Sequence, residues 1–171
     1  VYSVEHDAVL RSHALMHTEL TEAHDALDEG HHALYYAGTK PEGLPAEIAD
    51  FVLRVCDTTK ALDLDFPHAA NQHWLTRAAT TRAAREVSQQ ARLHDAERSA
   101  VLWLGQVRRH VDRASEAARI DDWRAYVEHL HVAVVYAASI VAGFGHDLNA
   151  AIEAKMAYNT TRPHRHGGKR A

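Results

Sequence analysis

The sequence predicts an all-α protein, a helical bundle built from two helical-hairpin repeats. Alanine is abundant, whereas only 4 prolines and 8 glycines occur among 171 residues, a composition that favours helix. Apolar residues also recur at intervals of three and four in several segments, which is the period of an amphipathic helix. A chain of this length with 46% hydrophobic residues suits one globular domain with a sizeable core.

The first helix is expected from about Ser3 to Asp28. Glu19 and Glu22 lie beside its predicted buried stripe, at a position that suits ligands at the edge of a pocket. The stripe itself follows four-three-four spacing and consists of Met16, Leu20, Ala23 and Leu27.

A turn region and a second helix follow. Gly30 can end the first helix or residues 33–36 can prolong it, whereas residues 38–43 are expected to form a loop. Pro45 suits the first turn of the second helix, because its missing N–H costs nothing there. This helix is expected to end near Leu64, and its apolar face consists of Ile48, Phe51, Val52, Val55, Cys56, Thr59 and Leu62.

Residues 73–99 have little apolar periodicity, and they predict a helix with a largely exposed face and a break near residues 94–95. The third well-patterned helix has a buried stripe at three-four-three spacing, made of Leu104, Val107, Val111 and Ala114.

Either Asp121 or Asp122 offers an N-cap for a fourth helix. Residues 132–141 are apolar almost all round, so this helix is expected at the centre of the bundle. A last short helix is expected from about Leu148 to Asn159.

Two acidic pairs, Glu19 with Glu22 and Glu47 with Asp50, suggest a metal site. In each pair a spacing of three places two carboxylates on one helix face, one turn apart. If the two helices are antiparallel neighbours, the four acids converge, and such a patch is costly unless a cation neutralises it. Oxygen ligands favour a hard divalent ion, so the pattern predicts Mg²⁺, with Mn²⁺ as a substitute.

The same four acids, with their loop and spacing, resemble the metal signature of the MazG-like all-α nucleoside triphosphate pyrophosphohydrolases. This superfamily includes phosphoribosyl-ATP pyrophosphohydrolases and dimeric dUTPases. Residues 155–169 are similar to the carboxy-terminal segment of MazG-like proteins from phages and actinobacteria. The two matches cover the first third and the last tenth of the chain.

The resemblance implies Mg²⁺-dependent hydrolysis of a (deoxy)nucleoside triphosphate between the α and β phosphates, giving a monophosphate and pyrophosphate. Purine deoxynucleotides are the favoured substrates. Glu19, Glu22, Glu47 and Asp50 are the expected metal ligands and catalytic residues, with Glu19 favoured as general base. The expected substrate contacts are Lys40, Asp57, Lys155, Tyr158, Asn159, Arg162 and Lys169, of which the basic ones suit phosphate oxygens. For Asp57 a solvated surface acid is an equal alternative.

An internal duplication is a further hypothesis. An offset of 81 places Glu128 on Glu47, and an offset of 91 places His110 on Glu19. The expected organisation is a first repeat over residues 1–72, a connecting helical segment over 73–99 and a degenerate second repeat over 100–171. The first repeat keeps the acids and the second has the basic tail. This distribution predicts a pseudo-dimer with one composite site.

Bulk properties limit the class of partner and the compartment. The formal charge of −4 gives no basic field for nucleic acid. The lone Cys56 excludes an intrachain disulfide, and no signal peptide or apolar run near the roughly 18 residues of a membrane span is expected. We therefore expect a cytoplasmic protein, with a homodimer as an open possibility.

Three alternatives remain from sequence alone. The first is a catalytically inactive structural or nucleotide-binding relative. The second is another metal-binding bundle, such as a di-iron protein, since Glu128 and His131 form a local Glu-x-x-His pattern. The third is nucleic-acid binding through the basic tail. Among the 15 histidines, His13 and His17 stand four apart and offer a weaker chelating pair.

Overall fold

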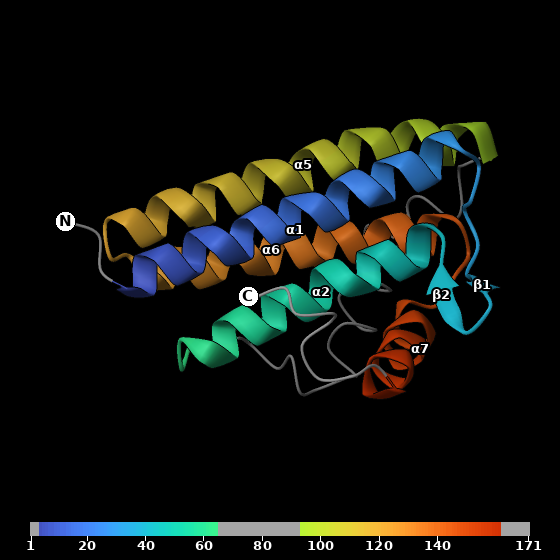
Figure 1. Ribbon diagram of the computed structural model, residues 1–171. Helices are drawn as coiled ribbons and strands as arrows, with labels where there is room; N and C mark the ends of the chain where they lie inside the picture. The colour runs from blue at the N-terminus through green and yellow to red at the C-terminus, as the bar shows by residue number, and fades with distance from the viewer. Residues whose placement is uncertain (1–3, 65–92, 162–171) are drawn as a thin grey trace.

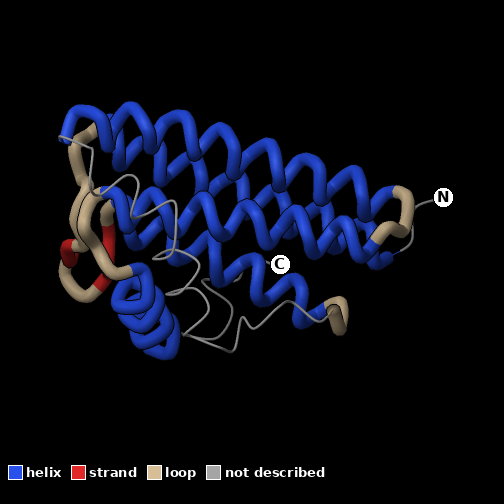
Figure 2. The backbone as a smooth tube through the Cα atoms, turned by 180° about the vertical axis from the view of Figure 1, so that it is seen from behind, coloured by secondary structure: helices blue, strands red, loops and turns tan. Residues whose placement is uncertain are grey.

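The all-α prediction is confirmed by the computed structural model, which describes residues 4–64 and 93–161. Four long helices, α1, α2, α5 and α6, lie side by side as a bundle, and α7 packs against the start of α2 (Figures 1 and 2). The bounds are α1 Val4–Asp28, α2 Leu44–Ala61, α5 Leu93–Arg119, α6 Trp123–Gly143 and α7 Leu148–Thr161.

The helices form two antiparallel hairpins, α1 with α2 and α5 with α6 (Figure 1). The second hairpin turns at residues 119–123, where the Asp122 carboxylate accepts a 3.0 Å hydrogen bond from the Ala125 amide. This bond satisfies an amide at the helix start that has no partner within the helix. The predicted cap is therefore confirmed at Asp122, the second of the two candidates.

Between α1 and α2 the chain forms a short β-hairpin, where we expected a loop or a longer helix. Strands β1 Tyr35–Ala37 and β2 Lys40–Glu42 pair antiparallel, with Tyr36 opposite Pro41. Gly38 supports this turn because its φ of 65° lies in the left-handed region. The expectation failed because two three-residue strands are too short to show alternation in the sequence.

The end of α2 and the start of α5 both differ from the predicted positions. Helix α2 ends at Ala61 rather than near Leu64, and its C-cap is Leu62. Helix α5 begins at Leu93, so residues 94 and 95 continue the helix instead of breaking it, and residues 93–99 belong to the second hairpin. The remainder of the predicted helix over 73–99 lies outside the described residues.

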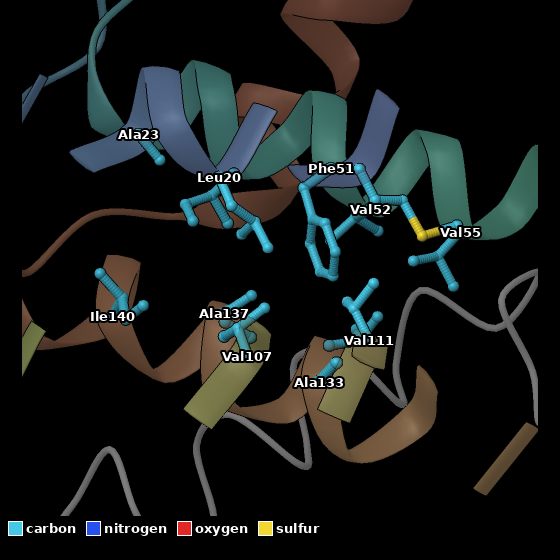
Figure 3. Packing of buried hydrophobic residues seen from close by; sticks show 14 of the residues in the cluster. Leu20, Ala23, Phe51, Val52, Val55, Val107, Val111, Ala133, Ala137 and Ile140 are labelled. Atoms are coloured by element: carbon cyan, nitrogen blue, oxygen red, sulfur yellow. The ribbon is translucent and has the colours of Figure 1, made fainter. Parts of the chain in front are cut away.

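The core lies between the two hairpins, and α6 is central to it as predicted. Phe51 and Leu20 of the first hairpin face Val107 and Ala137 of the second (Figure 3), and all four are fully buried. Burial of each of the three larger side chains, Phe51, Leu20 and Val107, stabilises the fold by about 1.5–3 kcal/mol.

Helix α6 is long and apolar enough, by length and composition alone, to cross a membrane, and half of the tested window is buried inside the protein. We had expected no such segment, because scattered polar residues interrupt the apolar run. The mean hydropathy within Trp123–Gly143 reaches 1.4 despite these polar residues. The core helix of a globular protein meets the same criteria of length and composition.

The buried positions of α2 and α6 coincide at an offset one residue larger than the predicted 81. On α2, Ile48, Phe51, Val52 and Val55 are buried. An offset of 82 (130 − 48) places them on four buried residues of α6, Leu130, Ala133, Val134 and Ala137. The predicted offset of 81 places three of them on half-buried residues instead, namely His129, Val132 and Tyr136. The duplication itself stays a prediction.

Candidate functional site

Three of the four predicted acids come together where α1 crosses the first turns of α2. Each of Glu19, Glu47 and Asp50 has a carboxylate oxygen within 4.8 Å of such an oxygen in the other two. Glu19 and Glu47 are buried, and Asp50 is partly exposed. The antiparallel α1–α2 hairpin and the spacing of three on α2 produce this convergence.

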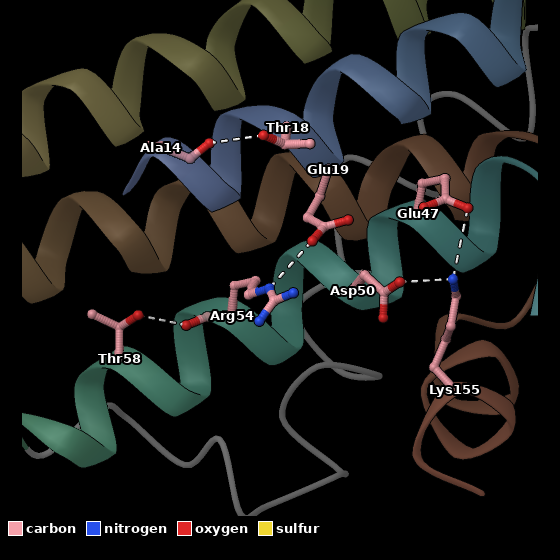
Figure 4. A network of polar contacts seen from close by, with 8 residues as sticks. All are labelled: Ala14, Thr18, Glu19, Glu47, Asp50, Arg54, Thr58 and Lys155. Carbon is pink, nitrogen blue, oxygen red and sulfur yellow. Dashed lines mark hydrogen bonds and ion pairs between the residues drawn. The ribbon is translucent and has the colours of Figure 1, made fainter. Parts of the chain in front are cut away.

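Two cationic side chains contact the cluster from opposite sides (Figure 4). Lys155 of α7 places Nζ 2.7 Å from Asp50 Oδ2 and 3.6 Å from Glu47 Oε1. Arg54, one turn beyond Asp50 on α2, donates from Nε to Glu19 Oε1 at 3.2 Å. Because the Lys155 side chain is only 2% exposed, its charge is held in the interior by these carboxylates.

Two of these carboxyl groups, those of Glu47 and Glu19, have raised pKa values. Burial, with a further contribution from the Asp50 carboxylate, raises the pKa of Glu47 from 4.5 to about 8, although Lys155 opposes the shift. Burial and Asp50 also raise the pKa of Glu19, and Arg54 opposes that shift. The pair of cations therefore compensates the three acids only in part.

The donor set fits a hard divalent cation. Among the described residues, Glu47 Oε2 is buried and has no hydrogen-bond partner. An orphaned buried carboxylate oxygen is costly, and a cation would satisfy it. Glu19, Glu47 and Asp50 supply only oxygen ligands, the type that Mg²⁺ and Mn²⁺ prefer.

Glu22, the fourth predicted ligand, lies at the edge of this group: its oxygens are outside the 4.8 Å set, but its carboxyl group interacts with that of Glu47 and adds to the raised pKa of Glu47. It is exposed one turn further along α1, and with Glu47 it lines a neighbouring cavity of about 170 Å³. The side chains of His31 and Tyr35 form another part of this wall, with their rings tilted by 58° to each other at a centroid distance of 5.2 Å. The remaining lining residues are Asp25, Ala26, Glu29, Glu42 and Gly43.

Lys40 is positioned beside the cluster by the β-hairpin. Its ammonium pairs with Glu42 at 2.6 Å. That hydrogen bond raises the pKa of Lys40, and the charges of Glu47 and Glu22 add to the effect. The predicted contact residue is thus within electrostatic reach of the acids, although its direct partner is Glu42.

The other predicted contact residues lie in three different situations. Asp57 is exposed two turns beyond Asp50 and is not part of the carboxylate cluster. On α7, Tyr158 is half-buried and Asn159 is exposed, one turn after Lys155. Arg162 and Lys169 lie outside the described residues.

Sequence reasoning missed Arg54. A signal for it existed, because Arg54 stands four residues after Asp50 and seven after Glu47, which places all three on one face of α2. The prediction for Lys155 named only a substrate contact and not its ion pairs with the acids, and here the sequence offered no signal. No local spacing indicates that this lysine, some hundred positions further along the chain, is buried against the acids.

The di-iron alternative does not agree with the position of Glu128. Its side chain is 62% exposed and bonds to Arg124 on the outer surface of α6. Carboxylate ligands of a di-iron bundle project into the core.

Comparisons of the chain with models of protein families, with curated proteins and with solved structures gave no match.

Proposed function

We propose that this protein is a Mg²⁺-dependent (deoxy)nucleoside triphosphate pyrophosphohydrolase. The observation that carries the proposal is the convergence of Glu19, Glu47 and Asp50 from two antiparallel helices, with one buried carboxylate oxygen left without a partner. The resemblance of the acidic signature to MazG-like enzymes supplies the reaction. Cleavage falls between the α and β phosphates and yields a monophosphate and pyrophosphate, with purine deoxynucleotides favoured.

Each part of the site has a task in this proposal. Glu19, Glu47 and Asp50 hold the divalent ion, which neutralises phosphate charge when bound. A carboxylate of the same cluster orients the attacking water, and we favour Glu19, whose carboxylate accepts a hydrogen bond from Arg54 that holds it in place. Within the described part of the chain, Lys155 has the ammonium nearest to the acids and is the first candidate to contact a phosphate.

The cavity beside Glu47 suits the nucleoside better than the phosphates. Five of its lining side chains are acids, which repel a polyphosphate but accept hydrogen bonds from amino groups and hydroxyls. The exposed Tyr35 ring provides a surface for base stacking. A Tyr35→Ala variant is therefore expected to raise KM for the nucleotide while kcat changes little, as measured by steady-state kinetics.

The decisive experiment is product analysis with a panel of dNTPs and NTPs in Mg²⁺. We expect monophosphate and pyrophosphate from at least one nucleotide, and loss of this activity in Glu47→Gln. Glu128→Gln is the matched control, because it makes the same change at an exposed position. Activity that survives in Glu47→Gln would contradict the proposed site, and no turnover by the folded, metal-loaded protein would favour an inactive relative.

A further inference from the structure

A pair of histidines on the second hairpin lies apart from the acidic cluster. His110 on α5 and His129 on α6 bring their Nδ1 atoms to 3.3 Å, and both side chains are half-buried. Their rings are tilted at 49° to each other, and Tyr136 stacks on His110 at a centroid distance of 6.0 Å. Packing between the two helices thus holds two imidazole nitrogens face to face.

This spacing suits two ligands of one ion. Zinc binds imidazole nitrogen at about 2.0–2.1 Å, so two nitrogens in a tetrahedral shell stand roughly 3.3–3.4 Å apart. A hydrogen bond between the rings is the competing explanation, with one Nδ1–H donating to the other Nδ1. At 3.3 Å that bond is longer than the usual distance of about 2.9–3.0 Å between a donor nitrogen and its acceptor.

The surroundings of His110 favour the neutral form of its ring, which is the form that binds metal. Burial, His129 and the guanidinium groups of Arg113 and Arg109 lower the pKa of His110. A neutral imidazole has a free lone pair, which a metal ligand requires. The same guanidinium groups oppose a cation, so the site needs an ion with high intrinsic affinity for nitrogen, which excludes Mg²⁺ and Ca²⁺.

The burial register relates this pair to the acidic cluster. The offset of 91 places His110 on Glu19 (110 − 19), and the burial-based offset of 82 places His129 on Glu47 (129 − 47) and Tyr136 on Arg54 (136 − 54). The contacts correspond as well, since His110 contacts His129 and Tyr136 while Glu19 contacts Arg54 and lies in the cluster with Glu47. An oxygen pair in the first hairpin therefore corresponds to a nitrogen pair in the second.

We propose that His110 and His129 form a second metal site, which binds a nitrogen-preferring transition-metal ion of the Zn²⁺, Ni²⁺ or Cu²⁺ class and links α5 to α6. Water or an anion completes the coordination shell. This site is independent of the proposed hydrolase activity, because it shares no residue with the acidic cluster.

The test is a Zn²⁺ titration of the full chain, followed by the side-chain nitrogen resonances of the histidines in NMR spectra. We expect Nδ1 of both His110 and His129 to shift on Zn²⁺ addition. His110→Gln and His129→Gln are each expected to weaken this binding by at least about tenfold. The double variant His110→Gln/His129→Gln should bind Zn²⁺ about as weakly as either single variant, because one histidine alone does not hold the ion.

Two control variants separate the site from other zinc-binding groups. His146→Gln removes a single half-buried histidine elsewhere, and Glu47→Gln alters the acidic cluster, so both should retain the His110 and His129 shifts. Zn²⁺-induced shifts confined to other histidines would overturn the proposal. Equal Zn²⁺ affinity in the wild type and in a folded His110→Gln protein would overturn it too, and would assign the contact to a hydrogen bond.

Discussion

Replacing Lys155 by Met tests whether the acidic cluster depends on a buried counter-charge. Methionine keeps an unbranched, flexible side chain but leaves Glu47 and Asp50 without the ammonium that lies 3.6 Å and 2.7 Å from them. Loss of one partner from a buried ion pair costs about 3–5 kcal/mol, because the other charge stays buried and uncompensated. The 24% exposure of the Asp50 side chain favours the lower end, near 3 kcal/mol.

For a protein of this size, a loss of about 3 kcal/mol corresponds to a decrease in Tm of roughly 6–12 °C. The assay is thermal and urea unfolding without divalent ions, followed by circular dichroism. Lys60→Met is the matched control, because Lys60 is exposed on α2, and it should change stability by less than about 0.5 kcal/mol. Adding Asp50→Asn to Lys155→Met should recover more than half of the loss, since it removes the carboxylate charge that the ammonium contacts at 2.7 Å in the wild type.

Magnesium provides the second readout for Lys155. The ammonium and a divalent ion compete for the same carboxylate oxygens, so Mg²⁺ should raise the Tm of Lys155→Met more than that of the wild type. The reasoning would be refuted if Lys155→Met were as stable as the wild type, or if the Asp50→Asn addition destabilised it further.

Three other outcomes follow from single contacts. In metal-free protein, the pKa of Glu47 is raised to about 8, against 4.5 in the unfolded chain. The protonated form of Glu47 therefore stabilises the fold fully below about pH 4.5, and this contribution to stability is lost as the pH rises through 8. Urea unfolding between pH 5 and 9 should show this decline in the wild type and a smaller one in Glu47→Gln. Gly43→Ala should cost about 2 kcal/mol or more in the same assay, because φ is 94° there and a Cβ would lie 2.3 Å from the Ala33 carbonyl oxygen; unchanged stability would contradict this local geometry. Tyr126→Phe should cost about 1–2 kcal/mol, since it removes the hydroxyl that lies 3.1 Å from the buried His13 Nε2, and a neutral effect would mean that this hydrogen bond contributes nothing.

The sequence by itself determined the helices and the composition of their buried faces. Met16, Leu20, Ala23 and Leu27 follow the helical period and are buried as predicted, and the Asp122 cap is a local signal that needs only its own turn. The acids could also be placed on helix faces in advance, because the spacing of three in residues 47–50 is a property of the helix alone.

Only the tertiary structure decided which charged groups meet. Glu19 lies within the 4.8 Å set of carboxylate oxygens and Glu22 lies at its edge, although both stand beside the same apolar stripe, because the crossing of α1 over α2 brings one turn of the helix closest. Lys155 reaches the acids because α7 packs against the start of α2, a contact between segments about a hundred residues apart. Likewise, the facing of His110 and His129 depends on the packing of α5 against α6. Periodicity is local and can be read from the chain, whereas the relative shift of two packed helices is set by how their side chains interdigitate.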